Sequence, residues 1–189
     1  MRKSFLIVAA AALAMGATFS SCGKKTVPQI AGEKEVTIPC NDKRTDKDFF
    51  RGLGVGQSAN VNTARDKARM AANAELSGSI STLIKQMSER YVNDAGQKVS
   101  DYAETFESMT KQVVNQQISN VSVACEKTMR TTDGMFKVYM SVEANKSEVF
   151  KALEREAEAN KKLETLFNRE KFRENFDAEM AEFAKKQGY

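Results

Sequence analysis

The stretch Phe49-Phe50-Arg51-Gly52-Leu53-Gly54-Val55-Gly56-Gln57-Ser58-Ala59 decides the fold of this 189-residue chain. Its first residues predict a strand, because large side chains alternate with small ones. One face carries Phe49, Arg51, Leu53 and Val55, and the other carries Phe50, Gly52 and Gly54. Glycine at every second position leaves that second face almost without side chains, so another backbone can lie very close to it.

The residues that follow predict a long helix from Asn62 to Tyr91. Its first half is lined with alanine and suits close packing on a sheet, whereas its second half carries bulky side chains and needs a wider partner. Gly78 costs about 1 kcal/mol relative to alanine in a helix, so we expect a bend there. The predicted buried positions are Ala64, Ala68, Ala71, Ala72, Leu76, Ile80, Leu83, Ile84, Met87 and Tyr91.

The same stretch formally matches a dinucleotide-binding pattern, G-x-G-x-x-A, over residues 54–59. A genuine fingerprint lies in a compact βαβ unit, with an acidic residue about 20 positions further on. Here one helical pattern continues to Tyr91 and no parallel strand follows it. The sequence therefore does not predict a nucleotide site, and we expect no cofactor.

The second half of the chain predicts a helix, a hairpin and a further helical region. Asn93-Asp94-Ala95-Gly96 ends the first helix, and a second helical pattern carries Tyr102, Phe106, Met109 and Val113. Two alternating runs then flank Asp133-Gly134, which is the strongest short-range hairpin signal. The first run places Val121, Val123, Cys125 and Met129 on one side, and the second places Phe136, Val138, Met140, Val142 and Ala144 on one side.

The C-terminal part begins with Asn145 and Glu148 in the spacing of a capping box. A heavily charged helix is expected over 161–189, with an aromatic stripe along it. Such a stripe usually packs on its own domain. The alternatives are that it binds a partner or lies on a membrane interface. The stripe consists of Phe172, Phe176, Met180 and Phe183.

These patterns predict one α+β domain over residues 49–189. A small antiparallel sheet, formed by the N-terminal strand and the hairpin, packs against the long helix, with an additional C-terminal helix. The core spans 49–160 and the charged C-terminal helix spans 161–189.

The N-terminus predicts an export signal. Met1-Arg2-Lys3 is basic, and the apolar run Phe5–Ala17 is shorter than the roughly 20 residues that a spanning helix needs. The following Phe19-Ser20-Ser21-Cys22-Gly23 resembles the lipobox of bacterial lipoproteins. That resemblance implies cleavage of a signal peptide (1–21) and lipidation of Cys22. The alternative is ordinary cleavage that leaves a free Cys22.

Residues 22–48 contain both prolines of the chain and little periodicity, so we expect a flexible tether, with a short strand at 36–38. No acidic cluster follows Cys22. In some Gram-negative groups such a cluster marks export to the cell surface. Since it is absent here, the resemblance to lipoproteins implies a protein that faces the periplasm.

The small-residue pattern Ala64-Arg65-x-x-Ala68-x-x-Ala71-Ala72-x-x-x-Leu76, after a Gly-x-Gly-x-Gly strand, resembles the Lpp-twenty family of bacterial envelope lipoproteins. The similarity covers roughly residues 49–144. It implies an α+β domain, an outer-membrane location and no established enzymatic activity. The family carries no catalytic residues to transfer.

Cys40 and Cys125 remain if Cys22 is lipidated. In an oxidising compartment they are candidates for a disulfide that would pin the tether to the sheet. The spacing does not require the bond, and Cys125 can equally serve as a small apolar residue in the strand.

Composition argues against several functions. The chain has no histidine, the commonest general base and metal ligand, and its formal net charge of +4 comes from interspersed signs rather than a basic block. We therefore expect no nucleic-acid partner, metal site or catalytic residue.

The leading hypothesis is a non-enzymatic, lipid-anchored module that binds envelope proteins or copies of itself. The alternative is a periplasmic module that binds a small ligand or cell-wall component in a helix–sheet groove lined by Leu76, Ile80, Val138 and Met140.

Overall fold

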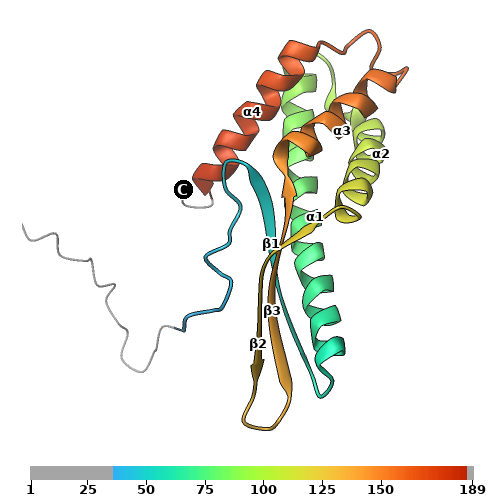
Figure 1. Ribbon diagram of the computed structural model, residues 1–189. Helices are drawn as coiled ribbons and strands as arrows, with labels where there is room; N and C mark the ends of the chain where they lie inside the picture. Colours follow the sequence, from blue (N-terminus) through green and yellow to red (C-terminus); the bar gives the residue numbers. More distant parts are fainter. Residues whose placement is uncertain (1–35, 187–189) are drawn as a thin grey trace, which may run out of the picture. The chain divides into compact units, whose positions relative to one another are not determined.

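The computed structural model describes residues 36–186. Three strands form one antiparallel sheet in the order β1-β3-β2, and the long helix α1 runs along one of its faces (Figure 1). This arrangement confirms the predicted α+β class. The elements are β1 (Phe49–Ser58), α1 (Val61–Asp94), α2 (Val99–Ile118), β2 (Ser122–Arg130), β3 (Phe136–Asn145), α3 (Lys146–Ala159) and α4 (Arg169–Lys186).

The glycine face of β1 touches the backbone of α1, as the sequence predicts. A Cβ atom on Gly52 would lie 2.6 Å from the backbone nitrogen of Leu76, closer than real Cβ contacts come. Gly54 and Gly56 meet the preceding turns of α1 in the same way. The small residues on both surfaces therefore set the distance between helix and sheet. On the same face, β3 contributes the buried residues Val138, Met140, Val142 and Ala144.

Helix α1 begins at a clear cap and continues without interruption through Gly78. The Asn60 side chain accepts hydrogen bonds from the backbone N–H groups of Asn62 and Thr63, which would otherwise lack partners. The alanine half of α1 packs on the sheet, and the bulky half extends toward α2 and α4 (Figure 1). The predicted difference between the two halves of this helix is confirmed, but Ala71, expected on the same side as Ala68 and Ala72, is exposed.

The β2–β3 hairpin turns at Asp133-Gly134, where Gly134 has a φ of 82°. Its register shifts near the start of β2, because Val123 pairs with Val142 whereas Cys125 pairs with Ser141. The extra residue is a β-bulge, and it places Val123 and Cys125 on opposite faces of the sheet. The prediction that these two share a face was wrong, since a bulge is invisible in a simple alternating pattern.

The C-terminal region holds two helices joined by turns. The Asn145 side chain caps α3 through the N–H of Ser147, but the Glu148 carboxylate pairs with Lys151. Helix α3 ends at Ala159, and α4 begins only at Arg169. The expected helix over 161–189 therefore starts later than predicted, because residues 161–166 form turns.

Candidate functional site

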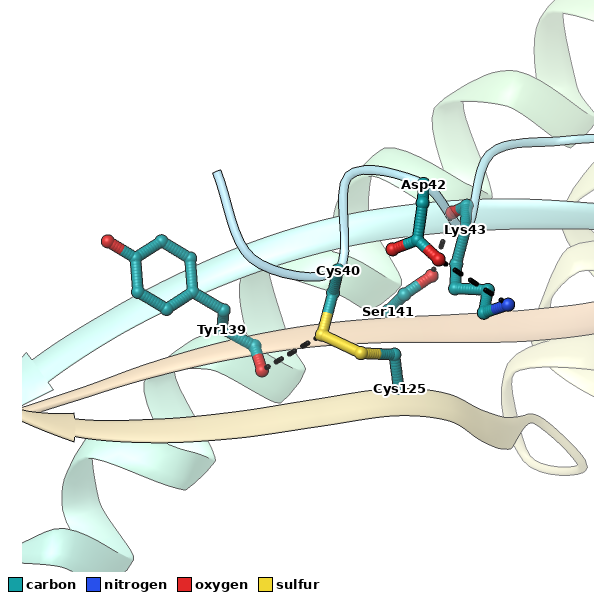
Figure 2. Close-up of a disulfide and its surroundings, with 6 residues drawn as sticks. All are labelled: Cys40, Asp42, Lys43, Cys125, Tyr139 and Ser141. Atoms are coloured by element: carbon teal, nitrogen blue, oxygen red, sulfur yellow. Dashed lines mark hydrogen bonds and ion pairs between the residues drawn. A yellow bond between two sulfur atoms is a disulfide. The ribbon is translucent and has the colours of Figure 1, made fainter. Parts of the chain in front are cut away.

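Cys40 and Cys125 form a disulfide, the pairing that the sequence left open (Figure 2). The Sγ–Sγ distance is 2.03 Å and the two Cα atoms lie 5.7 Å apart. Cys125 stands on the face of the sheet that points away from α1, which we call the outer face. Cys40 has a φ of 64°, the left-handed conformation that few residues other than glycine adopt. The bridge thus joins the N-terminal segment covalently to β2.

Hydrogen bonds hold the rest of this segment on the domain. The Thr45 hydroxyl is buried, accepts from the N–H of Arg51 at 2.9 Å and donates to the carbonyl of the same residue at 3.3 Å. The Ser141 hydroxyl of β3 donates to the carbonyl of Lys43 at 3.1 Å. The segment therefore satisfies polar groups along the edge of β1 and across the outer face.

These contacts correct the predicted domain boundary. The compact unit begins at Thr37, so the residues from there to Asp48 belong to the folded domain and not to a flexible tether. No strand forms at 36–38. The sequence missed this because the segment is held by side-chain hydrogen bonds and a disulfide, and neither produces an apolar period. Cys22, the predicted lipidation site, lies outside the described residues.

A network of charges anchors the end of the segment. Arg51, on the outer face of β1, bonds the carboxylates of Asp46 and Glu143, the latter at 2.7 Å between Nε and Oε2. Burial raises the pKa of Asp46, but hydrogen bonds from Arg51 and from the backbone of Asp48 and Phe49 outweigh it and bring this pKa below its usual value. The guanidinium thus bridges the segment, β1 and β3.

Lys146 is a buried cation at the start of α3. Its ammonium donates to the carbonyl oxygen of Asp46 and lies 5.3 Å from the centre of the Phe50 ring. Desolvation by burial lowers its pKa to about 8, although the carboxylates of Asp46 and Asp48 act in the opposite direction. A lysine with a lowered pKa is a common mark of a catalytic site. Here the contacts of Lys146 have a structural explanation, because its ammonium binds the carbonyl of Asp46 in the N-terminal segment.

The aromatic stripe of α4 packs inside its own domain. Phe172 is fully buried, Phe176 is nearly so, and Met180 and Phe183 pack partly buried against the core. The Phe172 ring lies 5.1 Å from that of Tyr91 in α1, measured between ring centres. The suggested use of this stripe as a partner-binding surface was therefore wrong, and the intramolecular alternative is confirmed.

The suggested ligand groove between helix and sheet is filled. Leu76, Ile80, Val138 and Met140 each have 0% exposed surface and belong to the main apolar core. A side chain with no accessible surface borders no space that a water molecule could enter. These four side chains therefore line no ligand cavity.

An apolar groove instead lies between α1 and α2, with a volume of about 460 Å³. It is hollow because small residues, Ser81 and Ser88 of α1 and Ala103 of α2, line it where larger side chains would close the gap. Its other lining residues include Val92, Val99 and Phe106. Two serines seven positions apart on one helix face are the sequence signal for this groove, but serine spacing on one helix does not predict which helix packs beside it.

Two hydroxyl groups of this groove, those of Ser88 and Thr110, already bond their own helices. The Ser88 hydroxyl donates to the carbonyl of Ile84 at 2.6 Å, and the Thr110 hydroxyl donates to that of Phe106 at 2.7 Å. The rims carry Lys85 with Glu89 and Lys111 with Glu107, each a pair within its own helix. The groove therefore presents an apolar floor between rims of balanced charge.

Within residues 36–186, no cluster of three or more His, Cys, Asp or Glu side chains is placed to hold a metal ion. In the same range, no helix combines the length and apolarity needed to cross a membrane. Comparison of the chain with protein-family models, curated proteins and solved structures found no match.

Proposed function

We propose that this protein is a lipid-anchored bacterial envelope lipoprotein that acts as a non-enzymatic structural or protein-interaction module. In this proposal Cys22 carries the lipid, and the domain faces the periplasm from the outer membrane. The resemblance to the Lpp-twenty family fits the α+β fold and remains a prediction.

The Cys40–Cys125 disulfide carries the proposal. Disulfides persist in oxidising compartments such as the bacterial periplasm and are rare in the cytosol. The bond therefore supports the export that Met1-Arg2-Lys3 and the apolar run after it predict. It also engages two of the three cysteines, so Cys22 is the one that stays available for acylation.

The α1–α2 groove is the surface that best fits a protein partner. An apolar groove between helices commonly receives the apolar face of another helix. Because the hydroxyls of Ser88 and Thr110 bond their own helix, and because the rim charges are paired, an apolar occupant leaves these two hydroxyls with their hydrogen bonds. A partner with an amphipathic helix meets these conditions.

The first test concerns the anchor. Mass spectrometry of the purified native protein should find an acylated Cys22 at the N-terminus, and membrane fractionation should show that Cys22→Ala releases the protein from the membrane. An unmodified Cys22 in the native protein would refute the anchoring part of the proposal.

The second test concerns the groove. Ala103→Trp places a large side chain in it, whereas Ala74→Trp places the same side chain on an exposed part of α1 before the groove begins. Crosslinking in intact cells should identify envelope partners for wild type and Ala74→Trp, and the Ala103→Trp protein should lose them. If both variants keep the same partners, the groove is not the interaction surface.

A second candidate function is binding of a small apolar ligand in this groove. Its volume falls within the range of roughly 300–1,000 Å³ that is typical of ligand sites. Mass spectrometry of the natively purified protein would detect a co-purifying apolar molecule, which Ala103→Trp should displace and Ala74→Trp should not.

A further inference from the structure

The outer face of the sheet is left open by the helices, since α1 covers the opposite face (Figure 1). Two cross-strand rows lie on this face beyond the disulfide. In the first row Val55 of β1 pairs with Tyr139 of β3, which pairs with Lys127 of β2. In the second, Gln57 pairs with Lys137, which pairs with Met129. We define the outer-face patch as Ile38, Val55, Lys127, Met129, Lys137 and Tyr139.

The patch is positively charged. Neither Lys127 nor Lys137 forms an ion pair with a carboxylate in the described part of the chain, and the Lys137 ammonium lies 5.3 Å from the centre of the Tyr139 ring. Glu126 points to the other face of the sheet, where it pairs with Arg65 at 2.8 Å. Asp133 is held in the hairpin turn by the Thr131 hydroxyl. The two rows therefore carry two cations and no anion.

Exposed apolar side chains accompany these cations. Val55 is 41% exposed and Met129 is 48% exposed. Ile38, 43% exposed, precedes Cys40 on the segment that the disulfide ties to this face. Exposed apolar groups between lysines, with a tyrosine beside them, are typical of surfaces that rest on a membrane interface.

We infer that the outer-face patch lies on an anionic phospholipid surface, with Lys127 and Lys137 against lipid phosphates and with Val55 and Met129 in the interface. The inference rests on the proposed lipid anchor. Each lysine near an anionic surface attracts it only modestly, so the contact depends on an anchor that keeps the domain close to the membrane. The patch then sets which side of the domain faces the membrane and leaves the α1–α2 groove for partners.

The absence of tryptophan from the chain allows a direct test with two single-tryptophan variants. Met129→Trp, the patch probe, places the tryptophan in the patch. Met70→Trp, the helix probe, places it on α1, where Met70 is 71% exposed. The chain from Cys22 to Tyr189, with its disulfide intact, has one free thiol and can be coupled to a maleimide lipid in vesicles. Both variants are then equally close to the bilayer.

On vesicles that contain phosphatidylglycerol, the emission of the patch probe should shift to shorter wavelength, and brominated phospholipids should quench it. The emission of the helix probe should keep its wavelength and resist quenching. High salt should reverse the response of the patch probe, because surface charges are screened. Equal responses of the two probes, no response of either, or an equal response of the patch probe on neutral phosphatidylcholine vesicles would each overturn the inference.

A second experiment reverses the charge of the two patch lysines. Lys127→Glu with Lys137→Glu, added to the Met129→Trp protein, should abolish the shift of the patch probe. Lys98→Glu with Lys161→Glu, at two exposed lysines away from the sheet, makes the same change of net charge and should leave the shift intact. If both pairs act alike, net charge and not the patch is responsible.

A shift of the patch probe with solubilised envelope proteins, but not with vesicles, would show a protein-docking surface and overturn the lipid assignment. The coupling at Cys22 is chemical, so the vesicle result does not depend on acylation in the cell. Failure of the proposed function would appear instead as an unmodified Cys22 in the native protein.

Discussion

Gly52 and Leu76 meet at a point where the structure has no room for a side chain, since a Cβ on Gly52 would lie 2.6 Å from the Leu76 nitrogen and 3.0 Å from its Cβ. Gly54 and Gly56 repeat the contact one and two turns earlier along α1. Backbone cannot give way as a flexible side chain does, so any residue larger than glycine must push the helix off the sheet.

Gly52→Ala should therefore destabilise the domain by about 3 kcal/mol, the upper range for overpacked cores. Urea unfolding followed by circular dichroism measures this change.

Gly78→Ala is the matched control for that measurement, because a Cβ at Gly78 meets no atom within 4 Å. In a helix interior this substitution should stabilise by about 1 kcal/mol. If Gly52→Ala and Gly78→Ala changed the free energy of unfolding in the same direction, the tight contact between β1 and α1 would be contradicted.

Loss of the disulfide should destabilise the domain strongly, because the bond joins residues 85 apart. By chain entropy, a cross-link over so long a loop contributes about 4.5 kcal/mol. Cys40→Ser with Cys125→Ser should lower the free energy of unfolding by about this amount, and trypsin should cut sooner after Lys43 and Arg44. As a control, Cys22→Ala should change neither the free energy of unfolding nor the rate of cleavage by trypsin. If the double variant were as stable as the wild type, the bond would not constrain the unfolded chain.

Lys146 should make stability rise with pH in alkaline solution. Its pKa is about 8 in the folded protein, against an ordinary value of 10.5, so the unfolded chain binds more protons between these two pH values. Under that condition the free energy of unfolding increases as pH rises from about 8 to about 10. Lys146→Met should remove this increase, as seen in unfolding curves at several pH values.

The control for that experiment is Lys151→Met, an exposed lysine on the same helix. The Lys151→Met protein should keep the alkaline rise of the wild type. If the free energy of unfolding still rose with pH in Lys146→Met, another titrating group would be its cause.

Tyr91→Phe should loosen the turns between α3 and α4. The Tyr91 hydroxyl donates to the carbonyl of Leu166 and accepts from the N–H of Asn168, both at 2.7 Å. The variant leaves both backbone groups without this partner, so we expect a loss of about 1–3 kcal/mol. Hydrogen exchange should accelerate over 160–168, whereas Tyr102→Phe, whose ring packs partly buried on the core, should leave exchange there unchanged.

The fold was predictable where a short run of sequence determines the structure. Alternate glycines in β1 and alanines in α1 predicted the close contact, and Asp133-Gly134 predicted the hairpin and hence the pairing of β2 with β3. These features depend on residues near one another in the chain, so their period is visible without tertiary contacts.

The remaining features depend on contacts between distant residues. The bulge near Ala124 changes the face of Cys125, and only the folded sheet shows that Cys40 can reach it. The late start of α4 depends on Tyr91, which bonds the turns from another helix. The α1–α2 groove depends on small residues of two helices that face each other. No local pattern specifies these distances.

The disulfide also determines how tension would travel through the protein. The shortest covalent path from the N-terminus to the C-terminus passes from Cys40 through the two sulfurs to Cys125, and so bypasses β1, α1 and α2 (Figure 2). A pull between the ends of the chain would be carried by the bond and by β2 and the elements after it. The backbone of β1, α1 and α2 would carry no tension, whereas β3, the central strand that contributes Val138 and Met140 to the core, would carry it.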